Sequence, residues 1–221
     1  MLKFIAHFIS LISHPLLIPT YMLVLLMTIN PYLFGMHDIS ERTSLDLLLR
    51  TFINTFFIPA FAIVIMKFQG LISSFQMEKK SERTGPYIIS GMFYIWHFRN
   101  ILDNTQVPLA FSSFILGATI ALFLAFLLNV FTKVSAHATG MGGLLAMVII
   151  TMLQFSYDSF VVHFSFGSLQ LNMTIVLIAT IMLAGIVGTA RLYLKAHIPS
   201  DLYGGYLIGF VSQVFAFRLL F

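Results

Sequence analysis

Long apolar runs alternate with short polar stretches along the chain. The runs lie near 15–30, 51–68, 86–102, 107–131, 140–156, 171–190 and 201–220. A membrane-spanning helix needs about 20 mostly apolar residues. The run 107–131 contains no charged residue, whereas the run after Pro86 is shorter and reaches His97 and Arg99. The pattern therefore predicts six or seven transmembrane helices.

These runs also indicate the fold class. Backbone polar groups must be hydrogen-bonded inside a bilayer, and the runs are far longer than the strands of a membrane β-barrel. We therefore expect an all-α polytopic membrane helix bundle that forms one domain over residues 1–221. Residues 1–13 are expected to be an amphipathic or re-entrant segment, because Pro15 and Pro19 separate them from the first span. Four glycines have spacings that suit close helix contacts: Gly142, Gly143, Gly205 and Gly209.

Composition supports a membrane protein. The chain has 221 residues, of which 59% are hydrophobic and 9% charged, and its mean hydropathy is +0.95. A soluble domain carries about 25% charged residues. The chain has no cysteine, which excludes disulfides and thiolate chemistry.

The positions of the charges are more informative than their sum. Half of the twelve Lys and Arg residues fall in three short stretches: Lys79, Lys80, Arg83, Lys133, Arg191 and Lys195. The stretches 78–87, 131–140 and 190–201 join the second span to the third, the fourth to the fifth and the sixth to the seventh. They are separated by even numbers of crossings, so all three are expected on one face of the membrane. A single shared site requires this arrangement.

The first stretch is MEKKSERTGPY, residues 77–87. The planar guanidinium of Arg83 can bind phosphate oxygens, with Lys79 or Lys80 as a point charge beside it. The alternative is a solvated juxtamembrane loop that is attracted to anionic lipid.

The second stretch is TKVSAHATGMGG, residues 132–143. Ser135 can cap the following helix, whose first-turn N–H groups are then free to bind phosphate. His137 would lie in that first turn, beside the anion. The alternative is an ordinary helix cap with an interfacial histidine.

The third stretch is ARLYLKAHIPSDLYGG, residues 190–205. Pro199 favours a helix start there, which places His197 just before the helix and Asp201 in its first turn. Asp201 can then fix the tautomer of His197 and stabilise its cation, and Arg191 can fold back over the same helix end. The alternative, a basic membrane anchor with a capping aspartate, leaves the spacing of His197 and Asp201 unexplained.

Together the three stretches resemble the motifs of the type 2 phosphatidic acid phosphatase family. One motif of this family consists of Ser-Arg, then five residues, His, three further residues and Asp. It is similar to Ala190, Arg191, His197 and Asp201, with Ala in place of Ser. The family's Pro-Ser-Gly-His is similar to Val134, Ser135, Ala136 and His137, with Val and Ala in place of Pro and Gly. A third motif of the family consists of Lys, six residues and then Arg-Pro. The chain matches this motif only loosely, because Thr84 and Gly85 separate Arg83 from Pro86.

This resemblance implies a metal-free and cofactor-free mechanism. His197 would attack phosphorus and form a phosphohistidine, Asp201 would orient its ring, and His137 would protonate the leaving oxygen and then activate water. The groups implied to hold the phosphoryl oxygens are Lys80 (with Lys79 open as the alternative), Arg83, Ser135, the amide of Ala136, and Arg191. The chain's eight acids also include no pair that flanks a histidine at metal-ligand spacing.

The expected function is hydrolysis of a membrane lipid phosphate or pyrophosphate, with the bilayer and this lipid as partners and no nucleic acid. The alternatives are a lipid phosphotransferase that uses the same histidine and a non-catalytic anion-binding transporter. Transporters place polar groups near the midplane, whereas these charges lie at helix ends. The remaining histidines are expected to be interfacial or bundle-lining and are assigned no chemistry: His7, His14, His37, His97 and His163.

Location and orientation follow from the resemblance. It implies the bacterial inner (plasma) membrane with the site facing outward. Lys and Arg number eight on the site face and four on the opposite face, which by itself favours a cytoplasmic site. Without the five candidate site cations (Lys79, Lys80, Arg83, Lys133, Arg191) the count is three against four, which favours neither side.

Overall fold

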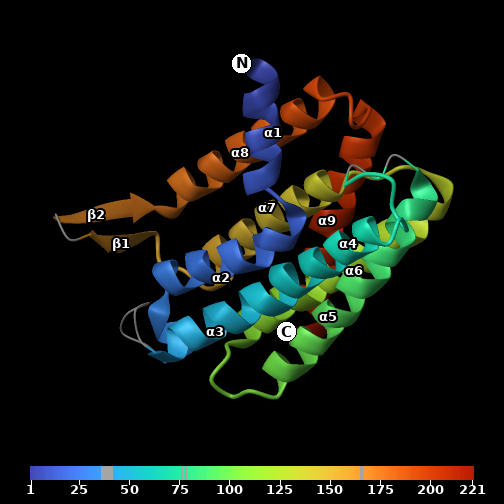
Figure 1. Ribbon diagram of the computed structural model, residues 1–221. Helices are drawn as coiled ribbons and strands as arrows, with labels where there is room; N and C mark the ends of the chain where they lie inside the picture. The colour runs from blue at the N-terminus through green and yellow to red at the C-terminus, as the bar shows by residue number, and fades with distance from the viewer. Residues whose placement is uncertain (36–41, 76, 78, 165–166) are drawn as a thin grey trace.

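The computed structural model describes residues 1–35, 42–75, 77, 79–164 and 167–221. His37 lies outside these residues. The structure is 79% helical, and its long helices run alongside one another (Figure 1). Within the described ranges, six helical segments are long and apolar enough to cross a membrane: Leu2–Ile29, Arg42–Phe68, Leu109–Phe131 (α6), Ala136–Gln154 (α7), Met173–Tyr193 (α8) and Pro199–Leu220 (α9). The predicted all-α membrane bundle is confirmed.

A further long helix, α5 (Thr84–Leu102), packs against α6 and has the length of a span. It is less apolar than the other six because it carries His97 and Arg99. His97 is buried and forms a 3.1 Å hydrogen bond with Thr51. Arg99 is exposed at the end of the helix, where it pairs with Asp103 at 3.2 Å. Both polar side chains therefore have partners, so α5 can pack in the bundle although it is less apolar than the other spans.

The amino-terminal segment is broken as the prolines predict. α1 (Leu2–Ile12) ends before Pro15, which opens a 3₁₀ helix at Pro15–Leu17, and α2 (Ile18–Ile29) follows. α1 packs on α8 and crosses it at an angle (Figure 1). The amino-terminal helix α1 thus lies against the carboxyl-terminal part of α8.

The second span is longer than the predicted run 51–68. It consists of α3 (Arg42–Phe52), a π-helical turn (Ile53–Phe57) and α4 (Ile58–Phe68). Pro59 has no N–H to donate, and a π turn just before it accommodates the interrupted hydrogen-bond ladder. An exposed ion pair between Arg50 and Asp46, at 2.8 Å, lies on the polar side of α3.

A β-hairpin between α7 and α8 was not predicted. β1 (Ser159–Phe164) pairs antiparallel with β2 (Gly167–Asn172), and Ser159 lies opposite Asn172. The β-branched and aromatic residues of SFVVHF favour a strand. The hairpin projects away from the helices in Figure 1, at the end of the bundle opposite to the α8–α9 junction.

The core lies around α2, α6 and α7, where the largest fully buried side chains include Met22, Leu23, Leu26, Phe111, Phe114, Met141 and Met147. The close contact expected from the glycines is confirmed between α7 and α9. A Cβ on Gly209 would lie 2.0 Å from the Thr139 carbonyl oxygen, and one on Gly205 would lie 2.8 Å from the Ser135 carbonyl oxygen. The glycines therefore let α9 pack closely against the first turn of α7.

Candidate functional site

The three polar stretches meet at one end of the bundle, as the even number of crossings predicts. Hydrogen bonds between described residues join them: Lys80 Nζ to Phe131 O (2.7 Å), Arg83 Nη1 to Val134 O (3.5 Å), Lys133 Nζ to Ala196 O (2.9 Å) and Ser135 N to Asp201 O (3.1 Å). Loops that are distant in sequence are thereby fixed against one another.

His197 and Asp201 form the contact that their spacing predicts. α9 begins at Pro199, so Asp201 lies in its first turn and His197 just before it. His197 Nδ1 is 3.1 Å from Asp201 Oδ2, and the same oxygen accepts the Ile198 N–H at 3.3 Å. Because a carboxylate accepts, the Nδ1–H of His197 donates to it. The lone pair of the neutral ring is then on Nε2.

The surroundings of His197 favour this neutral ring. Burial lowers the pKa of His197 to about 4. The hydrogen bond to Asp201 opposes the shift, whereas the cations Arg191, Lys133 and Arg83 add to it. At neutral pH the contact is therefore a hydrogen bond from a neutral imidazole and not an ion pair. A neutral ring with a free Nε2 is the form that can act as a nucleophile.

Two arginines line the same cavity as His197. Arg83 is buried and its Nε donates to Met77 O at 2.9 Å. Arg191 Nη1 donates to Ser10 Oγ at 3.3 Å, while its buried Nε has no hydrogen-bond partner among the described residues. An unpaired buried donor on a charged group is unfavourable. An anion bound beside Arg191 would satisfy it.

The second stretch forms the predicted helix start. Ser135 is the N-cap of α7, and its Oγ accepts the Ala138 N–H at 3.4 Å. Ala136 and His137 line the cavity described below, whereas Ser135 is fully buried behind them. His137 Nε2 lies 2.9 Å from the Ser10 carbonyl oxygen, so Nε2–H donates to that oxygen.

Lys79 and Lys80 lie apart from these groups. Both side chains are exposed, and Lys80 Nζ binds the Phe131 carbonyl oxygen at the end of α6. Neither lysine is among the described residues that line the cavity. The structure thus brings together Arg83, Ala136, His137, Arg191 and His197, with Asp201 behind His197, and leaves Lys79, Lys80 and Ser135 outside the cavity wall.

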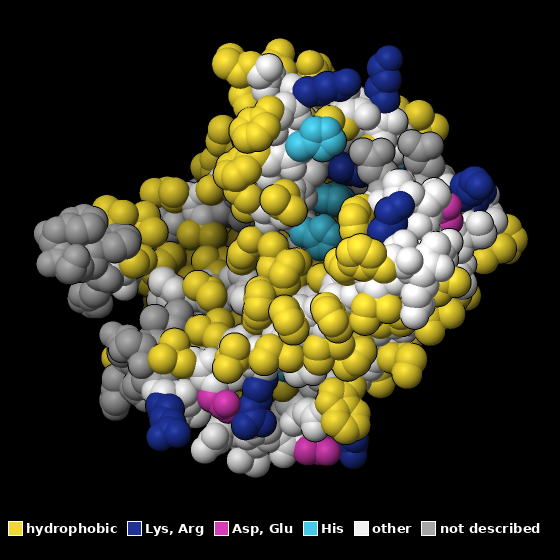
Figure 2. Space-filling model, viewed as in Figure 1, with side chains coloured by type: hydrophobic (Ala, Val, Ile, Leu, Met, Phe, Trp, Pro, Cys, Tyr) yellow, Lys and Arg dark blue, Asp and Glu magenta, His cyan; other side chains and the backbone are white. Residues whose placement is uncertain are grey.

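The cavity has a volume of about 570 Å³ and begins at these polar residues. Figure 2 shows histidines in a hollow near one polar rim of the molecule, with a broad hydrophobic belt between this rim and the charged groups at the opposite end. From the histidines the cavity extends between α5, α6 and α7. Its inner wall consists largely of apolar or small residues: Ile18, Pro19, Tyr94, Phe114, Ala118, Ala121, Leu122, Ala125, Gly140 and Gly143.

Comparisons with protein-family models, curated proteins and solved structures find no match. The assignment of a function therefore depends on the geometry of the site and on the motifs in the sequence.

The amino-terminal segment adds residues that the motifs do not indicate. His7, Ser10 and His14 all line the cavity, and Ser10 contacts both Arg191 and His137. The ring of His14, for which only an interfacial or bundle-lining place was expected, lies 5.8 Å from the ring of His137. A signal was present in the sequence, because positions 7, 10 and 14 recur at the spacing of one helix face.

Proposed function

We propose that the chain is a membrane lipid phosphatase of the type 2 phosphatidic acid phosphatase kind. The observation that carries this proposal is His197, hydrogen-bonded to Asp201, in one apolar cavity with the buried Arg83 and the half-buried Arg191. The arginines suit a phosphate group and the cavity suits a hydrocarbon chain. Such a combination of anionic head and apolar tail is that of a lipid phosphate.

In the proposed reaction, Nε2 of His197 attacks phosphorus while the bond from phosphorus to the lipid oxygen breaks. The leaving oxygen keeps the bonding electrons and takes a proton from the cationic form of His137, whose other N–H remains hydrogen-bonded to the Ser10 carbonyl oxygen. Asp201 stabilises the positive charge on the His197 ring. Water, deprotonated by His137, then attacks the phosphohistidine, which releases inorganic phosphate and restores His197.

The remaining groups stabilise charge on the phosphoryl oxygens. Arg83 and Arg191 hold them through their guanidinium forks, and the N–H of Ala136 at the start of α7 adds a backbone donor. Lys80 or Lys79 takes part only if its exposed side chain turns toward the cavity when substrate binds. The small residues on α6 and α7 leave room for the lipid chain beside these groups.

The first test is phosphate release in detergent from a panel of phosphatidic acid, phosphatidylglycerol phosphate, polyprenyl pyrophosphate and lipid A phosphate. We expect release from at least one lipid, and the rate should persist within about twofold after chelation of divalent ions, because the nucleophile is a histidine. Loss on chelation that an added divalent ion restores would contradict the mechanism. Transfer of the phosphoryl group to an added alcohol without release of inorganic phosphate would indicate a phosphotransferase. Retained anion binding with neither reaction would indicate a transporter.

We further propose that the site faces outward from the bacterial inner membrane. The chain has no cysteine, so single cysteines can report sidedness without background. Ser81→Cys, exposed beside the site, is expected to react with an impermeant maleimide in intact cells. Thr105→Cys, exposed in the loop between α5 and α6 at the opposite end, should react only after permeabilisation. The reverse pattern would place the site in the cytoplasm.

A further inference from the structure

His14 occupies a defined position at the junction of α1 and α2. It caps the 3₁₀ helix Pro15–Leu17, and its Nδ1 accepts the Leu16 N–H at 3.3 Å. An imidazole nitrogen that accepts from an amide carries no proton, so the proton of neutral His14 is on Nε2. The backbone therefore fixes His14 as a donor at Nε2.

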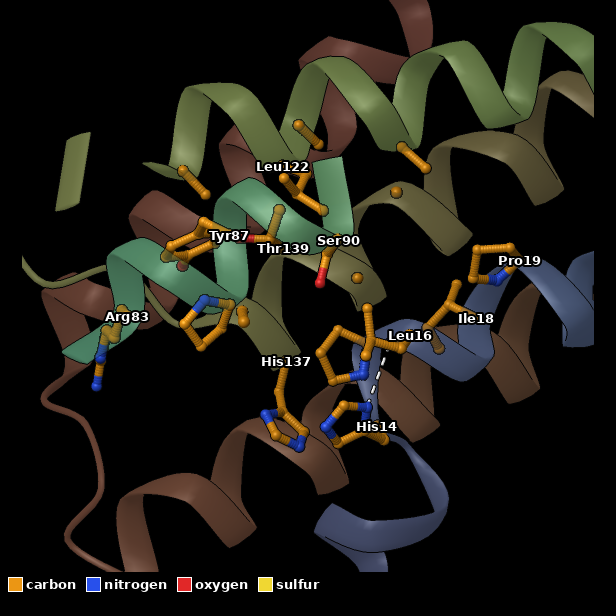
Figure 3. A pocket seen from close by; sticks show the side chains of 18 of the residues that line it. His14, Leu16, Ile18, Pro19, Arg83, Tyr87, Ser90, Leu122, His137 and Thr139 are labelled. Carbon is orange, nitrogen blue, oxygen red and sulfur yellow. Dashed lines mark hydrogen bonds between the residues drawn. The ribbon is translucent and has the colours of Figure 1, made fainter. Parts of the chain in front are cut away.

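The donor nitrogen belongs to the same cavity as the proposed phosphatase residues. Figure 3 shows His14 beside His137, with the bond to Leu16 on one side of the ring and the second nitrogen toward His137. The two rings meet edge to face, with centroids 5.8 Å apart and planes at 78°. Phe56 packs against His14 with a centroid distance of 6.1 Å and limits movement of the ring.

The two neighbouring histidines differ in whether their Nε2–H has a hydrogen-bond acceptor in the protein. Nε2–H of His137 donates to the Ser10 carbonyl oxygen at 2.9 Å. Nε2–H of His14 has no acceptor among the described residues. Arg191, whose Nε also lacks a partner there, lines the same cavity as His14. His14 and Arg191 line the same cavity, and two donors there without an acceptor among the described residues, one of them cationic, are complementary to an anion.

We infer that His14 contacts the substrate and donates a hydrogen bond from Nε2 to its phosphate group. This inference rests on the proposed phosphatase function. It makes the amino-terminal segment a fourth contributor to the site, next to the three polar stretches. It also accounts for the docking of α1 on α8, which places Ser10 against Arg191 and His137 and holds His14 at the cavity.

The test compares His14→Phe with His14→Gln. Phe keeps an aromatic ring against Phe56 but removes the donor, whereas the amide nitrogen of Gln reaches the position of Nε2. Hydrogen bonds to charged groups are strong enough that His14→Phe should lower kcat/KM for lipid phosphate about 10- to 100-fold. The inhibition constant for inorganic phosphate should rise over a similar range. His14→Gln should stay within about threefold of the wild type in both measurements.

Phe56→Leu is the matched control, because it loosens the packing of His14 without removing its donor. It should leave inhibition by inorganic phosphate unchanged. An unchanged inhibition constant in His14→Phe overturns the inference even if turnover falls, because His14 would then only pack. If His14→Phe does not fold, His14→Gln is compared with His14→Ala instead. The inference is overturned if both variants raise the inhibition constant for inorganic phosphate by the same factor. Absence of phosphate release by the wild type on every lipid overturns the proposed function together with this inference.

Discussion

His197→Ala is expected to abolish phosphate release from every substrate of the panel. The proposed covalent intermediate forms on Nε2 of His197, and alanine offers no nucleophile in its place. The loss should be on the order of 10⁴-fold or more, as when other enzymes lose their nucleophile. The measurement is phosphate release, together with trapping of labelled enzyme after a brief reaction. A phosphohistidine should survive alkaline but not acidic quenching, and should be missing from the variant.

A second buried histidine provides the control. His97 lies on α5, where it is hydrogen-bonded to Thr51 and does not line the cavity. Glutamine can retain a hydrogen bond to Thr51, so His97→Gln should fold and release phosphate within about threefold of the wild type. Turnover or a trapped phosphoenzyme in His197→Ala would refute the assignment of the nucleophile.

Those parts of the site that depend on local spacing and on topology could be predicted from the sequence. Pro199 starts α9, and the three residues between His197 and Asp201 then bring their side chains together across the first turn. The convergence of the three polar stretches follows from counting crossings, which needs only the apolar runs. The contact of Gly205 and Gly209 with α7 follows from small residues at a helix interface.

The parts that were not predicted depend on long-range docking or on flexible side chains. The contacts of Ser10 with His137 and Arg191 join residues 127 and 181 positions apart, and no local pattern shows that α1 returns to cover the site. Lys80 is favoured with Lys79 left open, because a long side chain can turn to either side of its loop. Lys80 binds a carbonyl oxygen of α6, a contact that charge and spacing alone do not reveal.

The arrangement around His137 leads to a prediction that separates its role from that of His197. His137→Ala is expected to reduce hydrolysis of a lipid phosphate by a factor on the order of 10²–10⁴, the range typical of general acid catalysis. A lipid alkoxide is a poor leaving group and needs the proton. An aryl phosphate with an acidic phenol leaves without it, so the acid-assisted step should lose far less on that substrate.

The two substrates act as controls for each other, since any general disturbance of the fold lowers both rates alike. If hydrolysis of the phosphohistidine becomes limiting in His137→Ala, the aryl substrate should show a burst of phenol before a slow steady rate. The burst should equal about one phenol per active site, because each His197 is phosphorylated once before water must attack. Equal losses on both substrates without a burst would contradict this role of His137. In that case its hydrogen bond to the Ser10 carbonyl oxygen would be structural, and the proton would have to come from another group of the cavity.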